Sequence, residues 1–296
     1  MSRHSYLILA HKDWVLFSKL LRCLDDPRNT VFIHIDKKAA FSLSEVYEPH
    51  RAEYVYIPRR RVSWGGFSQV EAELALLEAA TTRGFDYYHL LSGQDLPIKS
   101  QDYIYDFFDN QSQDNSYIGF SFTDLDTLVS QRLGQYHFLQ EIIGCNSSKQ
   151  IQIIKDLEDR SLDIQRRLKI NRVANYPFKV YKGSNWFSIN HELARYVLSR
   201  KKEIKKRFKN SKCADELFLQ TISKNSPFKH NIVPSNLREI DWIRGAPYTY
   251  RKADYSMLLA SDKLFARKFS TETDSEIIEM IFSHIMNEQN CELLCR

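Results

Sequence analysis

The sequence YYHLLSGQDLPIKS, residues Tyr87–Ser100, decides the fold of this chain. Leu90 and Leu91 are typical of the end of a buried strand, and polar and turn-forming residues then interrupt the apolar run. Ligands of open α/β sheets bind where strands end in such loops. The stretch therefore predicts a buried strand that leads into a ligand-binding loop. Three roles are open for Asp95 in this loop: it holds a metal ion, contacts a substrate or only shapes the turn.

Apolar runs alternate with amphipathic segments on both sides of this stretch. Ser5–Ala10 and Val31–Ile35 are typical of buried strands, and Asp13 is suited to cap a helix between them. A strand, a helix and a strand in this order predict a parallel βαβ unit. Further elements are expected as strands at Tyr54–Ile57, Tyr117–Phe122 and Trp186–Ile189 and as a helix at Asp102–Phe108. The alternation predicts a three-layer α/β fold with a mostly parallel central sheet.

The pattern changes between Thr123 and Lys182, where the sequence is polar and rich in Gln, Asp and Arg. This composition predicts a helical insertion, in which Arg132 and Tyr136 lie one turn apart on one helix face. We expect a single domain over residues 1–296, with a nucleotide-binding half at 1–122, the insertion at 123–182 and an acceptor-binding and catalytic half at 183–296. Capping boxes are expected to open two helices, formed by Ser68 with Glu71 and by Thr273 with Glu276.

The basic residues are unevenly distributed in a chain whose formal net charge is +5. Ser199–Lys212 carries eight basic residues against Glu203, and Arg59–Arg61 form a second cluster. Such a run is either a solvated helix face or a contact with an anionic surface, such as phospholipid headgroups or a phosphate-bearing substrate. No helix-turn-helix, zinc-finger or RNA-binding pattern accompanies the charge, so we expect no nucleic-acid partner.

The cysteines and the apolar runs indicate the compartment. Five cysteines are scattered without metal-ligand spacing, which favours a reducing compartment. No segment reaches the roughly 18 uninterrupted apolar residues of a membrane-spanning helix. The N-terminal MSRH leads directly into a strand, so no signal peptide is predicted. We therefore expect a cytoplasmic protein.

Three side chains have two interpretations each when only their spacing is considered. Asp36, at the end of the second strand, either binds sugar or nucleotide hydroxyls or caps a turn. Trp64, beside the turn formed by Gly65 and Gly66, is either a core residue or a stacking platform. Glu216 lies at the start of a helix, where acids usually stabilise the helix dipole and less often act in catalysis.

Seven motifs occur in one order along the chain: YLILAHKD, FIHIDKK, VSWGGFSQVEAELALL, YYHLLSGQDLPIKS, GSNWFSIN, ADELFLQT and LFARKFS. Together they resemble the Core-2/I-branching enzymes, which form glycosyltransferase family 14 and include relatives of peptide O-xylosyltransferase. The resemblance spans residues 5–270 and is weak only in the insertion. It implies a GT-A-like fold and an inverting transferase that uses a UDP-sugar, with N-acetylglucosamine as the first choice of sugar, and needs no metal ion or other cofactor.

The resemblance also implies roles for individual residues. Glu216 in ADELF corresponds to the general base that takes the proton of the acceptor hydroxyl. The departing UDP gains negative charge, and the family's basic residues that stabilise it correspond to Lys268 and to Arg244 or Arg251. The other implied contacts are His11, Asp36 and Trp64 for the nucleotide, and Ser92, Gly93 and Asp95 for the donor sugar or its loop. Candidates for the acceptor are Trp186, Arg132 and Tyr136, because aromatic faces stack on sugar rings and Arg binds hydroxyls or carboxylates.

The chain departs from the animal members, which are membrane-anchored, disulfide-bonded proteins of the secretory pathway. It resembles a bacterial or viral member that acts in cytoplasmic polysaccharide biosynthesis on a carbohydrate or lipid-linked glycan, with Ser199–Lys212 in peripheral contact with the inner face of an anionic membrane. Two alternatives stay open. One is a metal-dependent transferase with a DxD-like site at Asp95 or at Asp124 and Asp126. The other is a non-catalytic protein that binds carbohydrate or a polyanion.

Overall fold

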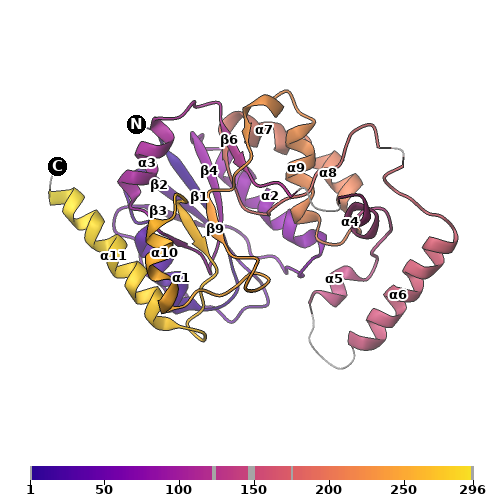
Figure 1. Cartoon of the computed structure of the whole chain (residues 1–296), viewed down its shortest axis with the longest axis horizontal. Helices are drawn as coiled ribbons and strands as arrows, with labels where there is room; N and C mark the ends of the chain where they lie inside the picture. The colour runs from indigo at the N-terminus through magenta and orange to yellow at the C-terminus, as the bar shows by residue number, and fades with distance from the viewer. Residues whose placement is uncertain (1, 122–124, 146–150, 175, 295–296) are drawn as a thin grey trace.

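In the part of the chain that the computed structural model describes, residues 2–121, 125–145, 151–174 and 176–294, a seven-stranded sheet forms the middle layer (Figure 1). The strand order is β3-β2-β1-β4-β7-β6-β8. The strands are β1 (His4–Ala10), β2 (Asn29–Ile35), β3 (Glu53–Tyr56), β4 (Tyr87–Ser92), β6 (Ser116–Ile118), β7 (Phe187–Asn190) and β8 (Ile232–Val233). β7 pairs antiparallel with β4 and β6, and the other neighbouring pairs of this described sheet are parallel. The predicted mostly parallel sheet is confirmed.

Helices cover both faces of this sheet, because the strands at its centre are apolar on both sides. Along β1, Tyr6 and Ile8 pack into one core, whereas Leu7 packs into the other. The first core is covered by α1 (Trp14–Cys23), α3 (Gln101–Asp109), α10 (Tyr255–Ala260) and α11 (Ser275–Leu294). The second is covered by α2 (Phe67–Thr81), α7 (His191–Ser199), α8 (Lys201–Phe208) and α9 (Phe218–Lys224). The three-layer α/β prediction is therefore confirmed.

A smaller sheet lies beside the end of β4 and is made of β5 (Leu96–Pro97), β10 (Phe265–Arg267) and β9 (Arg238–Ile240). β10 pairs antiparallel with β5 and parallel with β9. Phe269 N donates to Gln94 O at 3.0 Å, which ties the chain after β10 to the loop after β4. This small sheet therefore brings the C-terminal part of the chain to the ligand-binding edge of the large one. Short 3-10 helices occur at Leu43–Glu45, Ala214–Glu216, Lys229–Asn231 and Lys252–Asp254.

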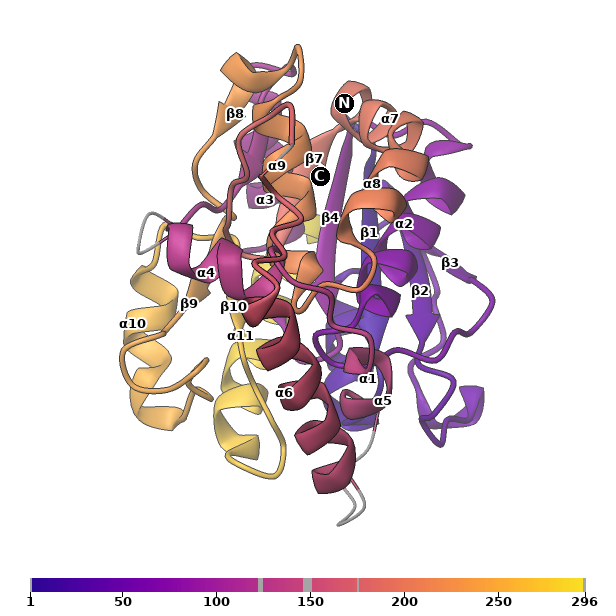
Figure 2. The same ribbon diagram turned by 90° about the vertical axis from the view of Figure 1, so that its right-hand side faces the viewer.

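The predicted helical insertion forms an arm at the end of the molecule opposite α11 (Figures 1 and 2). It contains α4 (Leu125–Arg132), α5 (Gln140–Ile143) and α6 (Ile151–Arg167). At its base, Ser121 N donates to Lys182 O at 2.9 Å in an isolated antiparallel bridge. The arm thus leaves the sheet after β6 and returns before β7 through one narrow neck. In the described residues, no helix combines the length and the apolar character that a membrane span requires.

Three local predictions are wrong. Gly66 takes the N-cap of α2, and Ser68 lies inside the helix, where its Oγ accepts from Ser63 N and donates to Glu141 Oε2, both at 2.8 Å. The start of α11 is capped by Asp274, whose Oδ1 accepts the N–H groups of Glu276 and Ile277 at 2.9 and 3.1 Å. The strand expected at Tyr117–Phe122 ends at Ile118, and Phe122 lies outside the described residues.

Candidate functional site

The carboxyl ends of β1, β2 and β4 meet at one edge of the central sheet. Ala10 is in register with Ile35, and Leu9 with Ser92. The residues that follow these strands therefore lie side by side at the edge where open parallel sheets bind ligands. Among the predicted residues, this register brings together His11, Asp36 and the loop Ser92–Asp95.

Asp36 is a buried carboxylate held by backbone N–H groups. Its Oδ1 accepts from Lys38 N at 2.9 Å and from Val62 N at 3.4 Å. Lys38 Nζ lies 3.6 Å from Oδ2. Arg59 Nη2 donates to the main-chain oxygen of Asp36 at 2.8 Å, which ties the basic cluster Arg59–Arg61 to this strand end. These bonds therefore hold the carboxylate of Asp36 in one orientation beside the end of β2.

Two lysines converge on the same edge. Burial and the nearby Lys12 and Arg267 lower the pKa of Lys268. Burial, together with Lys12, also lowers the pKa of His11, and Lys268 contributes to that lowering. Within the described residues, neither Lys12 nor Lys268 forms an ion pair with a carboxylate. A pair of neighbouring cations without acidic partners is a fitting site for a diphosphate.

Arg244 is already engaged by carboxylates. Its Nε lies 2.5 Å from Asp241 Oδ2, and its Nη1 lies 2.7 Å from Asp254 Oδ1. Its guanidinium also lies over the Tyr248 ring, 4.1 Å from the centroid, and Tyr248 O accepts from Lys268 N at 3.4 Å. Arg244 is thus held close to the Lys268 segment. Arg251 is exposed, and its N–H donates to Asp254 Oδ2 at 2.8 Å.

Asp95 is fully buried and holds the loop that follows β4. Its Oδ2 accepts from Ser92 N at 2.9 Å and its Oδ1 from Ser92 Oγ at 2.7 Å. The adjacent Gly93 N donates to Leu9 O at 2.9 Å, and a Cβ at Gly93 would lie 3.1 Å from that of Ala10. The loop is therefore packed tightly against β1, and the hydrogen bonds from Ser92 to Asp95 hold its conformation.

Arg267 lies between Asp95 and Trp186. Its guanidinium carbon is 3.9 Å from the centroid of the Trp186 ring, and Nη1 is 3.7 Å from Asp95 Oδ1. That Nη1 is buried without a hydrogen-bond partner in the described residues. Burial lowers the pKa of Arg267, and the Asp95 carboxylate opposes this. The stack fixes one face of the Trp186 ring.

Glu216 ends the 3-10 helix Ala214–Glu216 and is held by two cations. Its Oε2 accepts from Arg132 Nη1 at 2.5 Å, and Lys182 Nζ lies 3.5 Å from the same oxygen. The Glu216 side chain is 29% exposed, so a ligand hydroxyl can approach it. Lys182 and Trp186 are four residues apart on one segment, which spans at most about 14 Å when extended. This segment therefore links the Glu216 site to the Trp186 and Arg267 stack.

The Trp64 loop connects Glu216 to the arm. Gly65 has a φ of 68°, which favours glycine, and its carbonyl accepts from Cys213 N at 2.8 Å. Trp64 N donates to Gly144 O at 3.1 Å, and Trp64 O accepts from Gln140 Nε2 at 3.0 Å. The Trp64 ring itself is exposed, so of its two interpretations the core residue is wrong.

Two buried acids lie behind Glu216. Burial raises the pKa of Asp215 to about 7, and the negative charge of Glu216 adds to this. Glu73 of α2 is fully buried, and burial followed by the charge of Asp215 raises its pKa well above the usual range. Both Glu73 oxygens and Asp215 Oδ1 are buried without a hydrogen-bond donor in the described residues. Both acids therefore hold a proton to a higher pH than an exposed carboxyl group does.

This pair predicts a pH-dependent stability gain for Glu73→Gln. The raised pKa in the folded state means that stability is complete below the pKa of the unfolded Glu side chain and is lost as pH rises. Glu73→Gln has no carboxyl group to titrate and therefore does not lose this stability. The Tm difference between the variant and wild type should increase in favour of the variant by at least about 3 °C from pH 5 to pH 8. Thermal unfolding across that range measures it. The exposed Glu78→Gln is the control, and a Glu73→Gln difference that is constant with pH would contradict the raised pKa of Glu73.

Arg132 and Tyr136 do not share a helix face, which corrects the sequence prediction. α4 ends at Arg132, and Gly134 follows, whose N–H donates to Val129 O at 3.0 Å. Tyr136 lies beyond the helix, stacked on Phe138 with a centroid distance of 5.3 Å. Arg132 thus belongs to the Glu216 site, whereas Tyr136 belongs to the inner structure of the arm.

The alternative metal site is only partly within the described structure. Asp124 lies outside the described residues, as does the side chain of Asp126. The described residues contain no group of three or more His, Cys, Asp or Glu side chains placed to hold a metal ion. Asp95, the other candidate of the metal alternative, accepts hydrogen bonds from Ser92 through both of its carboxylate oxygens.

Sequence reasoning missed several residues of this site. Lys12 and Lys38 directly follow predicted strand ends, so their position was a usable signal. Lys182 lies in the polar insertion, where no pattern marks it. Glu73 was signalled by its place in the apolar stripe of α2, one turn from Val70. An acidic side chain in a buried apolar stripe is either paired with a cation or protonated.

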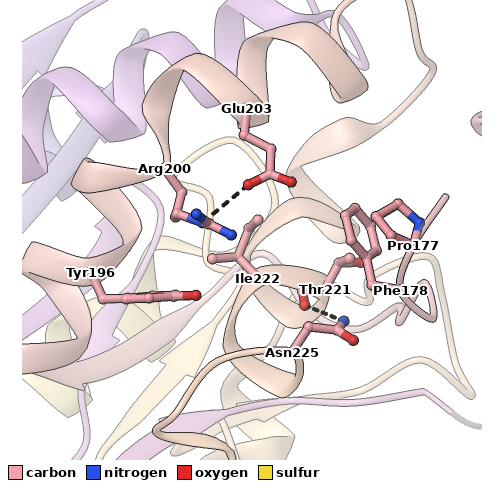
Figure 3. A pocket seen from close by; sticks show the side chains of 8 residues that line it. All are labelled: Pro177, Phe178, Tyr196, Arg200, Glu203, Thr221, Ile222 and Asn225. Carbon is pink, nitrogen blue, oxygen red and sulfur yellow. Dashed lines mark hydrogen bonds and ion pairs between the residues drawn. The ribbon is translucent and has the colours of Figure 1, made fainter.

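A separate pocket lies between α7, α8 and α9 (Figure 3). Its volume is about 290 Å³, and its lining residues are Pro177, Phe178, Tyr196, Arg200, Glu203, Thr221, Ile222 and Asn225. Arg200 Nε lies 3.0 Å from Glu203 Oε2, and Asn225 Nδ2 donates to Thr221 O at 2.7 Å. Because these polar groups already satisfy one another, we assign no ligand to this pocket.

Comparison with known proteins gives relatives over nearly the whole chain. Xylosyltransferase sqv-6 from Caenorhabditis briggsae is 23% identical over 315 residues, which covers 93% of this chain and 36% of the relative. The N-acetyllactosaminide beta-1,6-N-acetylglucosaminyl-transferase of Homo sapiens is 22% identical over 305 residues, with 94% and 70% coverage. The chain spans about a third of the length of the xylosyltransferases that it matches.

A solved structure of S. aureus TarS residues 1–349 covers 69% of this chain at 12% identity, and its TM-score of 0.29 is too low to bear on the fold. The family model described as Core-2/I-Branching enzyme matches residues 5–261. That match includes the strand ends at His11, Asp36 and Ser92 and the segment that carries Glu216. The chain therefore belongs to the Core-2/I-branching enzyme family.

Proposed function

We propose that this protein is an inverting, metal-independent glycosyltransferase. It transfers a sugar from a UDP-sugar to a carbohydrate or lipid-linked glycan acceptor. The observation that carries the proposal is the partly exposed carboxylate of Glu216, whose carbonyl accepts from Gly183 N at 2.9 Å, just before β7 begins at the binding edge. Lys12 and Lys268, at the same edge, form no ion pair in the described residues. A base for the acceptor and positive charge for the leaving group are the two requirements of this transfer.

On the donor side, the uridine and ribose bind at the ends of β1 and β2, beside His11 and Asp36. Lys268 and Lys12 contact the diphosphate. Arg244 joins them if it exchanges Asp241 for phosphate oxygens, and Arg251 is the other candidate for this contact. The loop Ser92–Asp95 forms the floor under the donor sugar. N-acetylglucosamine is the first choice, because the human relative of which this chain covers 70% is named for its transfer.

On the acceptor side, Glu216 takes the proton of the attacking hydroxyl while the new bond forms at the anomeric carbon, opposite the breaking bond to UDP. This geometry inverts the anomeric configuration. Arg132 and Lys182 keep the carboxylate in one orientation, and the Trp186 ring stacks on the acceptor sugar. UDP leaves with the electron pair of the broken bond, and Lys268 stabilises its charge.

A cytoplasmic location and peripheral contact with an anionic membrane belong to the same proposal. The four described cysteines, Cys23, Cys145, Cys213 and Cys291, are free thiols, which fits a reducing compartment. Four of the basic residues between α7 and the end of α8 are paired with Glu71, Glu78 or Glu203. The basic run is therefore partly neutralised by the protein itself, and only its remaining lysines are available to a membrane.

Thermal unfolding with a panel of UDP-sugars in EDTA tests the donor and the metal independence together. A donor at about 100 times its Kd is expected to raise the Tm by about 5 °C, because ligand binding stabilises only the folded state. A shift that appears only after manganese is added would contradict the metal-free mechanism. The absence of any shift, together with salt-sensitive binding of a polyanion, would favour the non-catalytic alternative.

A further inference from the structure

The helix α6 presents an aliphatic stripe to solvent. Ile153, Leu157, Ile164 and Leu168 are exposed by 65%, 51%, 57% and 67%. Leu168 N donates to Ile164 O at 3.0 Å, so the helical path continues through Leu168. At about 100° per residue, the four side chains fall within about 60° of one another around the axis. They share one face in two pairs, separated by the turn that carries Arg160 and Ser161, and we call the four residues the α6 stripe.

The inward side of α6, about 100° around the axis from the stripe, carries the buried Ile151, Glu158 and Gln165. Glu158 Oε2 accepts from Leu139 N at 3.2 Å, and Gln165 exchanges two hydrogen bonds with the backbone of Tyr136, at 2.7 and 2.9 Å. Glu158 and Gln165 are both buried. These specific bonds fix the rotation of the helix, so the α6 stripe cannot turn inward without breaking them. A surface helix normally turns its apolar side chains inward, whereas four aliphatic side chains of α6 face solvent.

Basic residues border the C-terminal end of the α6 stripe. After Asp163, the exposed charges are those of Arg166, Arg167 and Lys169. Arg166 is paired with Asp163, and the N-terminal half carries Asp156 and Asp159 against Lys155 and Arg160. The surplus of positive charge is therefore at the C-terminal end of the stripe.

The end of α8 adds further positive charge beside this border. The guanidinium of Arg172, which follows α6, donates to the main-chain oxygens of Arg207, Lys209 and Asn210 at 2.8 to 2.9 Å. Exposed lysines of this region that have no ion pair in the described residues are Lys202, Lys206, Lys209 and Lys212. Both views show α6 as the outermost element on its side of the molecule (Figures 1 and 2).

We propose that the α6 stripe lies in the interface of an anionic lipid bilayer, with the basic border and the end of α8 against the phosphate headgroups. An exposed apolar face beside a cluster of Lys and Arg is the arrangement of interfacial helices. This inference extends the membrane contact of the proposed function and adds the element that enters the lipid. It also places the arm, which contributes Arg132 to Glu216, at the lipid surface.

Sedimentation of the full chain with vesicles tests this proposal without any donor or acceptor. We expect binding to vesicles of phosphatidylcholine and phosphatidylglycerol in equal parts, and little binding to pure phosphatidylcholine. Leu157→Gln with Ile164→Gln should lower the partition constant at least about tenfold, because both apolar side chains enter the lipid. Arg167→Gln with Lys169→Gln should lower it by a similar factor at low salt.

Leu43→Gln is the matched control, because Leu43 is 61% exposed and lies outside the arm. It should bind vesicles like wild type. Transfer to a soluble acceptor should be unchanged in the stripe variant, so a failure of catalysis and a failure of lipid binding are distinguishable. Vesicle binding that the stripe variant retains would overturn the proposal. So would a concentration-dependent dimer that the same variant dissociates, seen by light scattering without vesicle binding, because a second copy would then cover the stripe.

Discussion

Glu216→Gln is expected to lower the rate of sugar transfer by about 10³-fold, because the acceptor hydroxyl then has no base to take its proton. Glutamine has nearly the same shape, and its carbonyl oxygen can still accept the hydrogen bond from Arg132 Nη1. Binding of UDP should remain within about twofold of wild type, because the proposed nucleotide contacts are at the ends of β1 and β2 and do not include Glu216. Steady-state kinetics and calorimetry with UDP measure the two effects.

The matched control for this prediction is Glu203→Gln. Glu203 also accepts from two cations, with Arg200 Nε and Arg207 Nε both 3.0 Å from its oxygens, but it lies on α8 away from the strand ends. Its variant should transfer sugar at the wild-type rate. If both variants lose activity equally, loss of an ion pair and not loss of a base explains the result. A Glu216→Gln variant with more than a tenth of wild-type activity would remove Glu216 from the role of base.

Lys268→Met is expected to lower kcat/KM for the donor by about 10²-fold, because the developing charge on UDP loses a direct contact. The affinity for UDP should fall as well, since product and transition state share the diphosphate. Lys263→Met serves as the control: Lys263 lies on the same segment, and its Nζ is paired with Asp262 Oδ1 at 2.9 Å. Unchanged UDP affinity in Lys268→Met would assign the diphosphate to Arg244 or Arg251 instead.

The pH profile offers a second readout for Lys268. Partial burial and the neighbouring Lys12 and Arg267 lower its pKa, so the lysine loses its proton at a lower pH than a free lysine does. Activity should therefore decline on the alkaline side earlier than expected for an unperturbed lysine. Lys268→Arg keeps its charge at high pH and should move this decline upward. A purely structural Lys268 would leave the alkaline limb where it is.

The sequence predicted the sheet and most of the strand-end residues, because both depend on local patterns. Apolar runs that end in polar residues marked β1, β2 and β4, and parallel pairing then placed His11 and Asp36 at one edge. The motif ADELF drew attention to Glu216. These features are encoded within a few residues of each other, so no knowledge of distant contacts was needed.

The remaining parts of the site depend on contacts between distant segments. Lys182 reaches Glu216 across the neck of the arm, and Arg267 reaches Trp186 from the small sheet. Ser68 has the sequence of a capping residue, but its hydroxyl bonds Glu141, 73 residues away. In each case the tertiary partner decided the role, and no local periodicity could indicate that partner.

The neck between Ser121 and Lys182 gives the arm the geometry of an inserted module. Both of its ends lie at one point, where Ser121 N bonds Lys182 O and a Cβ at Gly183 would collide with Gly119 O. β7 runs antiparallel to its neighbours, so it begins at the binding edge, and the neck of the arm lies at that edge. An arm of another length or sequence would fit the same neck without changing the register of any strand. Under the two proposals above, the acceptor contact through Arg132 and the contact with the membrane would be exchanged together, while the strand ends proposed for the donor stay as they are.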